Sequence, residues 1–164
     1  MEELIPKLHG KDATAIPGAR ELLDSIVSVK APWAIVTSGS APLARGWLNT
    51  LHFPHPDYLI TAESVEIGKP DPACYRLGLE KLKLEHDSTR VVVFEDSPAG
   101  ILAAKAAGCK VIGLVTSHAL GQILAAEPDW VLQDLQSVEL VEFAAGLVTL
   151  QISNAFSPAF QEDK

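Results

Sequence analysis

The chain has 164 residues, of which 48% are hydrophobic and 21% are charged, and this is enough apolar side chain for one sizeable core. Its formal net charge is −8 and it holds no run of lysine and arginine, so a nucleic-acid backbone or an anionic membrane is excluded as its main partner. The first eleven residues lack the apolar segment of a signal peptide, and no stretch approaches the ~18 apolar residues of a membrane span. We therefore expect a cytoplasmic protein with small-molecule partners.

Short apolar runs alternate with segments of helical spacing along most of the chain. The predicted order is a helix from residue 17, strand 33–36, helix 43–51, strand 58–60, a helix from residue 72, strand 91–94, helix 98–108, strand 111–115, helix 118–126 and strand 130–132. Residues 139–143 and 147–152 alternate enough to allow a late hairpin, and the last ten residues or so are expected to be frayed.

Apolar strands separated by helices are typical of a parallel sheet that is buried on both faces. The predicted fold class is therefore α/β, with a Rossmann-like parallel sheet, helices on both faces and right-handed crossovers. In such sheets, ligands bind beyond the carboxyl ends of the strands. Functional residues are expected at those strand ends.

Two adjacent carboxylates, Glu95 and Asp96, directly follow the predicted strand 91–94. One carboxylate would be enough for an N-cap of the next helix, where negative charge is favoured. Two adjacent like charges are better explained if a cation such as magnesium removes their mutual repulsion. We therefore expect Glu95 and Asp96 to form a metal site.

Hydroxyl and lysine side chains follow two other predicted strands. Ser38 and Gly39 lie in a turn after the first strand, and alone this is a weak signal because serine and glycine are common in turns. Lys69 lies between a glycine and a proline just before a helix, although a lone lysine is usually a solvated surface residue. Together with the acidic pair, these residues suit a phosphoryl group and its magnesium ion.

Three segments in this order, IVTSGS, GKPDP and VVVFEDSPAGILAAKAAGCKVIGLVTS, resemble the second, third and fourth motifs of the haloacid dehalogenase (HAD) superfamily of phosphohydrolases. Within it, residues 16–135 are similar to the fungal sugar- and polyol-phosphate phosphatases, such as glycerol-1-phosphatase and 2-deoxyglucose-6-phosphatase. The resemblance implies a HAD core that hydrolyses a small phosphorylated sugar or polyol with Mg2+ as cofactor.

The resemblance also implies a role for each matched residue. Ser38 would donate its hydroxyl, and Gly39 its backbone N–H, to the transferring phosphoryl group. Lys69 would neutralise the phosphoryl oxygens and the nucleophile. Asp96 would bind magnesium directly, and Glu95 would orient the ligands around that metal. Ser38 and Lys69 are thus the implied catalytic residues.

The first motif of the family is missing from this sequence. That motif is DxDGT at the end of a strand, where the first Asp forms an aspartyl-phosphate and the second acts as general acid and base. No Asp-x-Asp pair occurs anywhere in the chain. The helical cap domain that follows this strand in the family is missing as well, and with it the part that selects the substrate. We therefore expect the chain alone to be inactive and to bind magnesium weakly.

The missing strand has consequences for the sheet and for the division of the chain. In the family's strand order it lies between the strands that end at Ser38 and Asp96, so these must pair directly, admit water or borrow a strand. Residues 1–15 are interpreted as a remnant of the cap or a linker, 16–137 as the HAD-like core, and 138–164 as a C-terminal extension.

Three hypotheses of different classes stay open from the sequence. The chain is a phosphatase that has lost its N-terminal part, a non-catalytic remnant that binds phosphate or nothing, or a fragment that acts only with a partner chain that supplies the first strand. The resemblance favours phosphatase ancestry, whereas the missing nucleophile argues against activity of this chain.

Overall fold

The computed structural model describes residues 5–156, and most of the expected frayed tail lies outside them. The helices are α1 (Ile5–His9), α2 (Ala19–Ser28), α3 (Ala41–Thr50), α4 (Ala73–Leu82), α5 (Pro98–Ala106) and α6 (Leu120–Ala125). The strands are β1 (Ala34–Val36), β2 (Tyr58–Ile60), β3 (Val92–Glu95), β4 (Lys110–Leu114), β5 (Trp130–Leu132), β6 (Val138–Ala144) and β7 (Leu147–Ile152). The order of helices and strands predicted between residues 17 and 132 is confirmed. No helix of residues 5–156 is long and apolar enough to cross a membrane.

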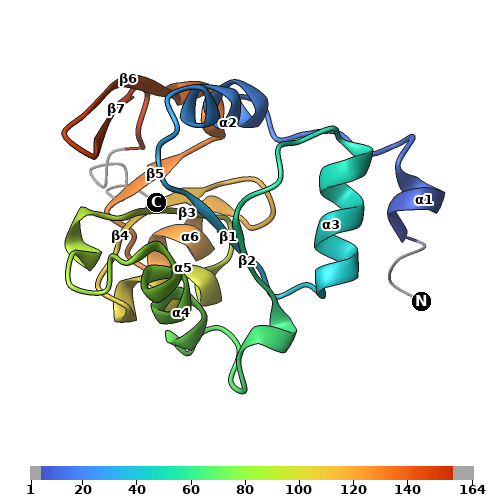
Figure 1. Ribbon diagram of the computed structural model, residues 1–164, viewed down its shortest axis with the longest axis horizontal. Coiled ribbons are helices and arrows are strands. Elements are labelled where there is room, and N and C mark those ends of the chain that lie inside the picture. The colour runs from blue at the N-terminus through green and yellow to red at the C-terminus, as the bar shows by residue number, and fades with distance from the viewer. Residues whose placement is uncertain (1–4, 157–164) are drawn as a thin grey trace, which may run out of the picture.

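The strands of the α/β core are all parallel, but they form two separate sheets. β1 pairs with β2, and β4 pairs with β3 on one side and β5 on the other (Figure 1). The predicted α/β class with parallel strands is confirmed. The two sheets are separated between β1 and β3, the strands that were expected to pair directly, admit water or borrow a strand. They are not hydrogen-bonded neighbours in the described part of the chain.

The sheet β3-β4-β5 is buried on both faces. Val111 and Val131 belong to a core with Ile101 of α5 and Ile123 of α6. The next residue of β4, Ile112, belongs to a second core on the other face, beneath α2. Successive side chains of a strand point to opposite faces, so an uninterrupted apolar strand needs a cover on both sides. This explains why β4 reads as a continuous apolar run.

Among residues 5–156, no strand pairs with the edges of β1 and β3 that face away from their partners. The Thr37 N–H donates to the Ile60 carbonyl at 2.9 Å, so the alternate residues Ala34 and Val36 direct their backbone groups away from β2. By the same alternation, Val92 and Phe94 direct theirs away from β4. Direct pairing of β1 with β3 and insertion of the C-terminal extension are therefore both absent from the described residues.

The C-terminal extension forms an antiparallel hairpin instead. β6 and β7 pair with each other through a turn in which Ala145 and Gly146 both have positive φ, 52° and 76°. This is the turn geometry whose twist suits a two-residue hairpin loop. Leu150 and Ile152 pack against the core beside Leu22 of α2. The hairpin therefore covers α2 and leaves the edges of β1 and β3 open.

Gly18 is expected to be the glycine whose replacement costs most among those with positive φ. Its φ is 81°, and a Cβ there would collide with the backbone of Leu135 and Gln136. The left-handed conformation costs about 1–2 kcal/mol for alanine, and the collision adds to it. We expect Gly18→Ala to lower the free energy of unfolding in urea by ~3 kcal/mol. Gly146→Ala is the matched control, because Gly146 has a φ of 76° but open space around it, and equal losses in both variants would contradict this account.

Candidate functional site

Lys69 lies where the ends of β1 and β3 approach each other. Its ammonium donates a hydrogen bond to the Val36 carbonyl at 3.2 Å and forms an ion pair with the Glu95 carboxylate. The side chains of Lys69 and Glu95 are only 9% and 6% exposed. Since the Val36 carbonyl points to the open edge of β1, the ammonium satisfies an acceptor that a neighbouring strand would otherwise use.

The Glu95 carboxylate is fully engaged by neighbouring donors. One oxygen accepts from Lys69 and from the Tyr75 hydroxyl, and the other accepts from the Ser97 hydroxyl at 3.0 Å. Gly100 lies so close that any side chain there would collide with this carboxylate. Glu95 is therefore held in place by α4 and α5, and this geometry favours a role in orienting the site over direct binding of a metal.

Asp96 has a different environment from its neighbour. No described residue donates a hydrogen bond or forms an ion pair with its carboxylate, which is partly exposed. Its backbone carbonyl accepts from the Ser117 hydroxyl and from His118 Nδ1, each at 2.9 Å. A free carboxylate is what magnesium needs from a protein, so Asp96 fits a metal ligand. Residues 5–156 contain no group of three or more His, Cys, Asp or Glu side chains that could hold a metal by itself.

The turn after β1 places Ser38 at the surface and Gly39 inside a local network. Ser38 is exposed, two residues after the Val36 carbonyl that Lys69 contacts. The Gly39 N–H donates to the Thr37 hydroxyl at 3.0 Å, so it would have to exchange that partner for a phosphate oxygen. Ser40 caps α3 by accepting from the Leu43 N–H at 3.4 Å. The turn is short because this cap starts the next helix at once.

The structure brings Ser38, Lys69, Glu95 and Asp96 to the same edge of the two sheets, and it adds residues that the sequence interpretation missed. His118 lies in the loop after β4, and its Nδ1 contacts the Asp96 backbone carbonyl. Its position just after β4 was the available signal, since that strand end belongs to the same edge.

Tyr75 donates its buried hydroxyl to Glu95, and this interaction makes stability depend on alkaline pH. Burial raises the pKa of Tyr75 far above its ordinary value of 10, and the Glu95 charge raises it further. Above pH ~10 the unfolded chain loses this proton while the folded chain keeps it, so the contribution to stability is complete below pH 10 and declines above it. Above pH ~10, the free energy of unfolding should fall more steeply with pH in the wild type than in Tyr75→Phe. We expect the two slopes to differ by about 1.4 kcal/mol per pH unit. Parallel urea titrations at pH 9 to 11.5 measure the difference, and identical slopes would contradict a neutral buried Tyr75.

Comparison with known proteins gives one family. The pattern of the haloacid dehalogenase-like hydrolases matches residues 7–108. Glycerol-1-phosphate phosphohydrolase 1 of Saccharomyces cerevisiae is 36% identical over 151 residues, which cover 88% of this chain and 60% of that protein. Hexitol phosphatase A of Escherichia coli is 41% identical over 149 residues, which cover 91% of this chain and 67% of that protein.

Further relatives agree with this result. The 2-deoxyglucose-6-phosphate phosphatase 1 of S. cerevisiae is 36% identical over 97% of this chain and 71% of that protein. The crystal structure of CbbY from Rhodobacter sphaeroides, in complex with xylulose-(1,5)bisphosphate, superposes with a TM-score of 0.68 at 28% identity, over 80% of this chain and 58% of that one. The chain thus spans about 60% of the glycerol-1-phosphate phosphohydrolase that it matches. The expected resemblance is confirmed, and the chain belongs to the haloacid dehalogenase-like hydrolases, related to the yeast glycerol-1-phosphatases and 2-deoxyglucose-6-phosphatases.

Proposed function

We propose that this chain carries the phosphoryl- and magnesium-binding half of a phosphatase for small phosphorylated sugars or polyols. The observation that carries the proposal is the buried Lys69 ammonium, fixed between the Val36 carbonyl and the Glu95 carboxylate at the ends of β1 and β3. The relatives' names support the substrate class, because they include phosphatases of glycerol phosphate, hexitol phosphate and 2-deoxyglucose phosphate.

Each residue of the site would have one task in binding a phosphoryl group. Lys69 would supply a fixed positive charge, held in place by Glu95. Ser38 would donate its exposed hydroxyl, and Gly39 would donate its N–H once Thr37 releases it. Asp96 would offer a free carboxylate to magnesium, which lowers the negative charge of the phosphoryl oxygens when it is bound. These residues would therefore bind the phosphoryl group and its magnesium ion, but none of them would attack phosphorus.

The nucleophile would have to come from outside the described residues. The chain has no Asp-x-Asp pair, while β1 and β3 leave facing edges without a strand. An extended segment between them would pair with Ala34 and Val36 on one side and with Val92 and Phe94 on the other, and would end beside Lys69. We propose that a segment of this kind, from a partner chain or from sequence beyond residues 5–156, carries the carboxylate that attacks phosphorus.

One observation favours a non-catalytic role instead. The charge of Lys69 is already neutralised by Glu95, and Tyr75 and Ser97 complete a network that needs no ligand. Such a network is also what a purely structural core would contain. This second candidate predicts no phosphate binding at Lys69.

Binding of inorganic phosphate separates the two candidates. We expect weak, saturable binding that requires Mg2+, seen as shifts of the Gly39 and Asp96 amide signals in NMR spectra. Asp96→Asn should abolish this Mg2+-dependent binding without unfolding the chain, because its carboxylate forms no hydrogen bond or ion pair with a described residue. The same substitution at Asp24, an exposed acidic residue within α2, serves as the control. Phosphate binding that is tight without Mg2+, or that Asp96→Asn leaves unchanged, would contradict the proposed site.

A further inference from the structure

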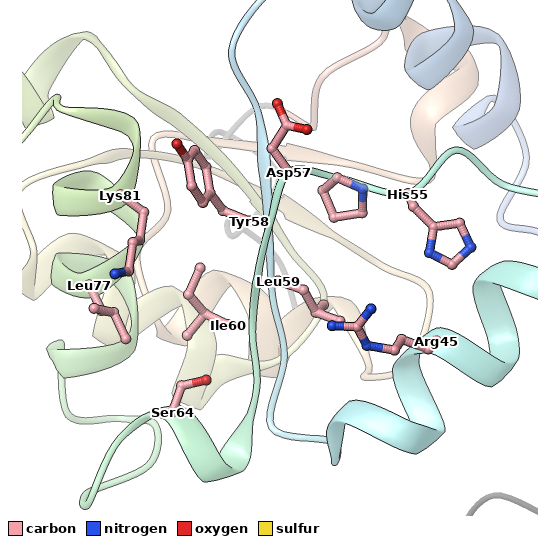
Figure 2. A pocket seen from close by; sticks show the side chains of 10 residues that line it. Arg45, His55, Asp57, Tyr58, Leu59, Ile60, Ser64, Leu77 and Lys81 are labelled. Atoms are coloured by element: carbon pink, nitrogen blue, oxygen red, sulfur yellow. The ribbon is translucent and has the colours of Figure 1, made fainter.

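A groove of about 300 Å3 lies along the outer edge of β2, and no residue of the proposed phosphoryl site lines it. Strand β2 and the turn before it form the floor. Arg45 of α3 stands on one side, and Leu77 and Lys81 of α4 stand on the other (Figure 2). The groove is therefore flanked by two helices, each of which contributes one long cationic side chain.

The floor of the groove is an unpaired strand edge. Among the described residues, β2 pairs with β1 alone. Because the Ile60 carbonyl accepts from the Thr37 N–H, the backbone groups of Ile60 face β1, and the alternate residue Leu59 directs its N–H and carbonyl to the groove. Unpaired edge groups of this kind readily pair with an extended segment of another chain.

Both walls carry a positive charge without a protein partner. Arg45 and Lys81 are exposed, and neither forms an ion pair or a side-chain hydrogen bond with any residue between 5 and 156. Among the residues that line the groove, Asp57 is the only acidic one. The whole chain has a net charge of −8. Two cations without an ion-pair partner therefore make this groove a positively charged site on a negatively charged protein.

We propose that this groove docks a short, acidic, extended peptide segment of a partner protein, which adds to β2 as a strand. Neighbouring side chains of an extended peptide point to opposite faces. Two adjacent acidic residues would therefore place one carboxylate toward Arg45 and the other toward Lys81, while the peptide backbone pairs with Leu59. The proposal concerns a different surface from the phosphatase site and does not rest on it.

The geometry disfavours other ligands for this groove. A single small anion would leave the unpaired backbone N–H and carbonyl of Leu59 unused. A nucleic acid would bring a long line of phosphates against a protein of net charge −8. An acidic strand uses the two cations and the free edge together.

Two fluorescent hexapeptides of equal composition test the proposal. In the first, two glutamates are adjacent, and in the second a valine separates them, so that both carboxylates point to the same face. We expect the first peptide to bind about 2- to 5-fold more tightly in fluorescence anisotropy, since only it reaches both walls with a carboxylate. Its affinity should fall as the salt concentration rises.

Variants of the protein give the matched control. Arg45→Glu combined with Lys81→Glu should abolish binding of the first peptide. Lys11→Glu combined with Lys30→Glu changes the net charge equally at exposed positions outside the groove and should leave binding nearly unchanged. Circular dichroism checks that both double variants stay folded. Equal affinity for the two peptides, unchanged binding by the Arg45 and Lys81 variant, or displacement of the peptide by succinate or by an oligonucleotide at equal charge would overturn the proposal.

Discussion

The purified chain is expected to release no p-nitrophenol from p-nitrophenyl phosphate in the presence of Mg2+. The residues that we propose to bind phosphoryl oxygens are in place, but no aspartate stands at the end of a strand with a second aspartate two positions later. Loss of a nucleophile typically lowers kcat by ~10^6-fold, which puts turnover below detection. A colorimetric assay of the wild type beside Lys69→Ala measures this directly.

A supplied strand should restore turnover. We would fuse to the N-terminus an apolar strand segment that ends in Asp-x-Asp-Gly-Thr, and an identical segment with both aspartates replaced by asparagine as the control. If only the fusion with aspartates turns over substrate, the added strand lies between β1 and β3 and brings its carboxylate beside Lys69. The opposite result would be turnover by the unmodified chain that Lys69→Ala or Asp96→Asn abolishes, because another residue would then have replaced the nucleophile.

Glu95→Ala is expected to cause the largest loss of stability among substitutions at the site, about 3–5 kcal/mol in the free energy of unfolding. The substitution would leave the buried Lys69 ammonium without its counter-charge and the Tyr75 hydroxyl without its acceptor. Since whole domains have only about 5–15 kcal/mol of stability, this is a large share. Urea unfolding followed by circular dichroism measures the loss.

Two further variants separate loss of the charge pair from loss of volume at this position. Glu95→Gln keeps an acceptor for Tyr75 but removes the charge, so its loss should be smaller than that of Glu95→Ala. Lys69→Met combined with Glu95→Leu removes both charges and should recover most of the stability, because apolar replacement of a whole buried pair is often neutral. If the double variant were as unstable as Glu95→Ala, packing would explain the loss and the buried ion pair would not.

Local patterns in the sequence were sufficient to predict the helices and strands. The apolar run Val91–Phe94, followed by Pro98 at the first turn of a helix, predicts a strand and then a helix from neighbouring residues alone, and β3 and α5 occur there. Family motifs were sufficient to bring Ser38, Lys69 and Asp96 to attention, because their order along the chain matches the order of strand ends. These features depend on side-chain periodicity and turn preferences, which act over a few residues.

The tertiary structure alone decided how the strands pair and which charges are free. Nothing in the run Glu95-Asp96 shows that the first carboxylate is enclosed while the second is left open. Ser97 is a neighbour in the sequence, but Lys69 and Tyr75 come from a distant loop and from α4. The division into two sheets, the contact of His118 with Asp96 and the groove beside β2 have the same origin. Each depends on contacts between residues far apart in the sequence, and such contacts are set by the packing of whole elements, which local periodicity does not encode.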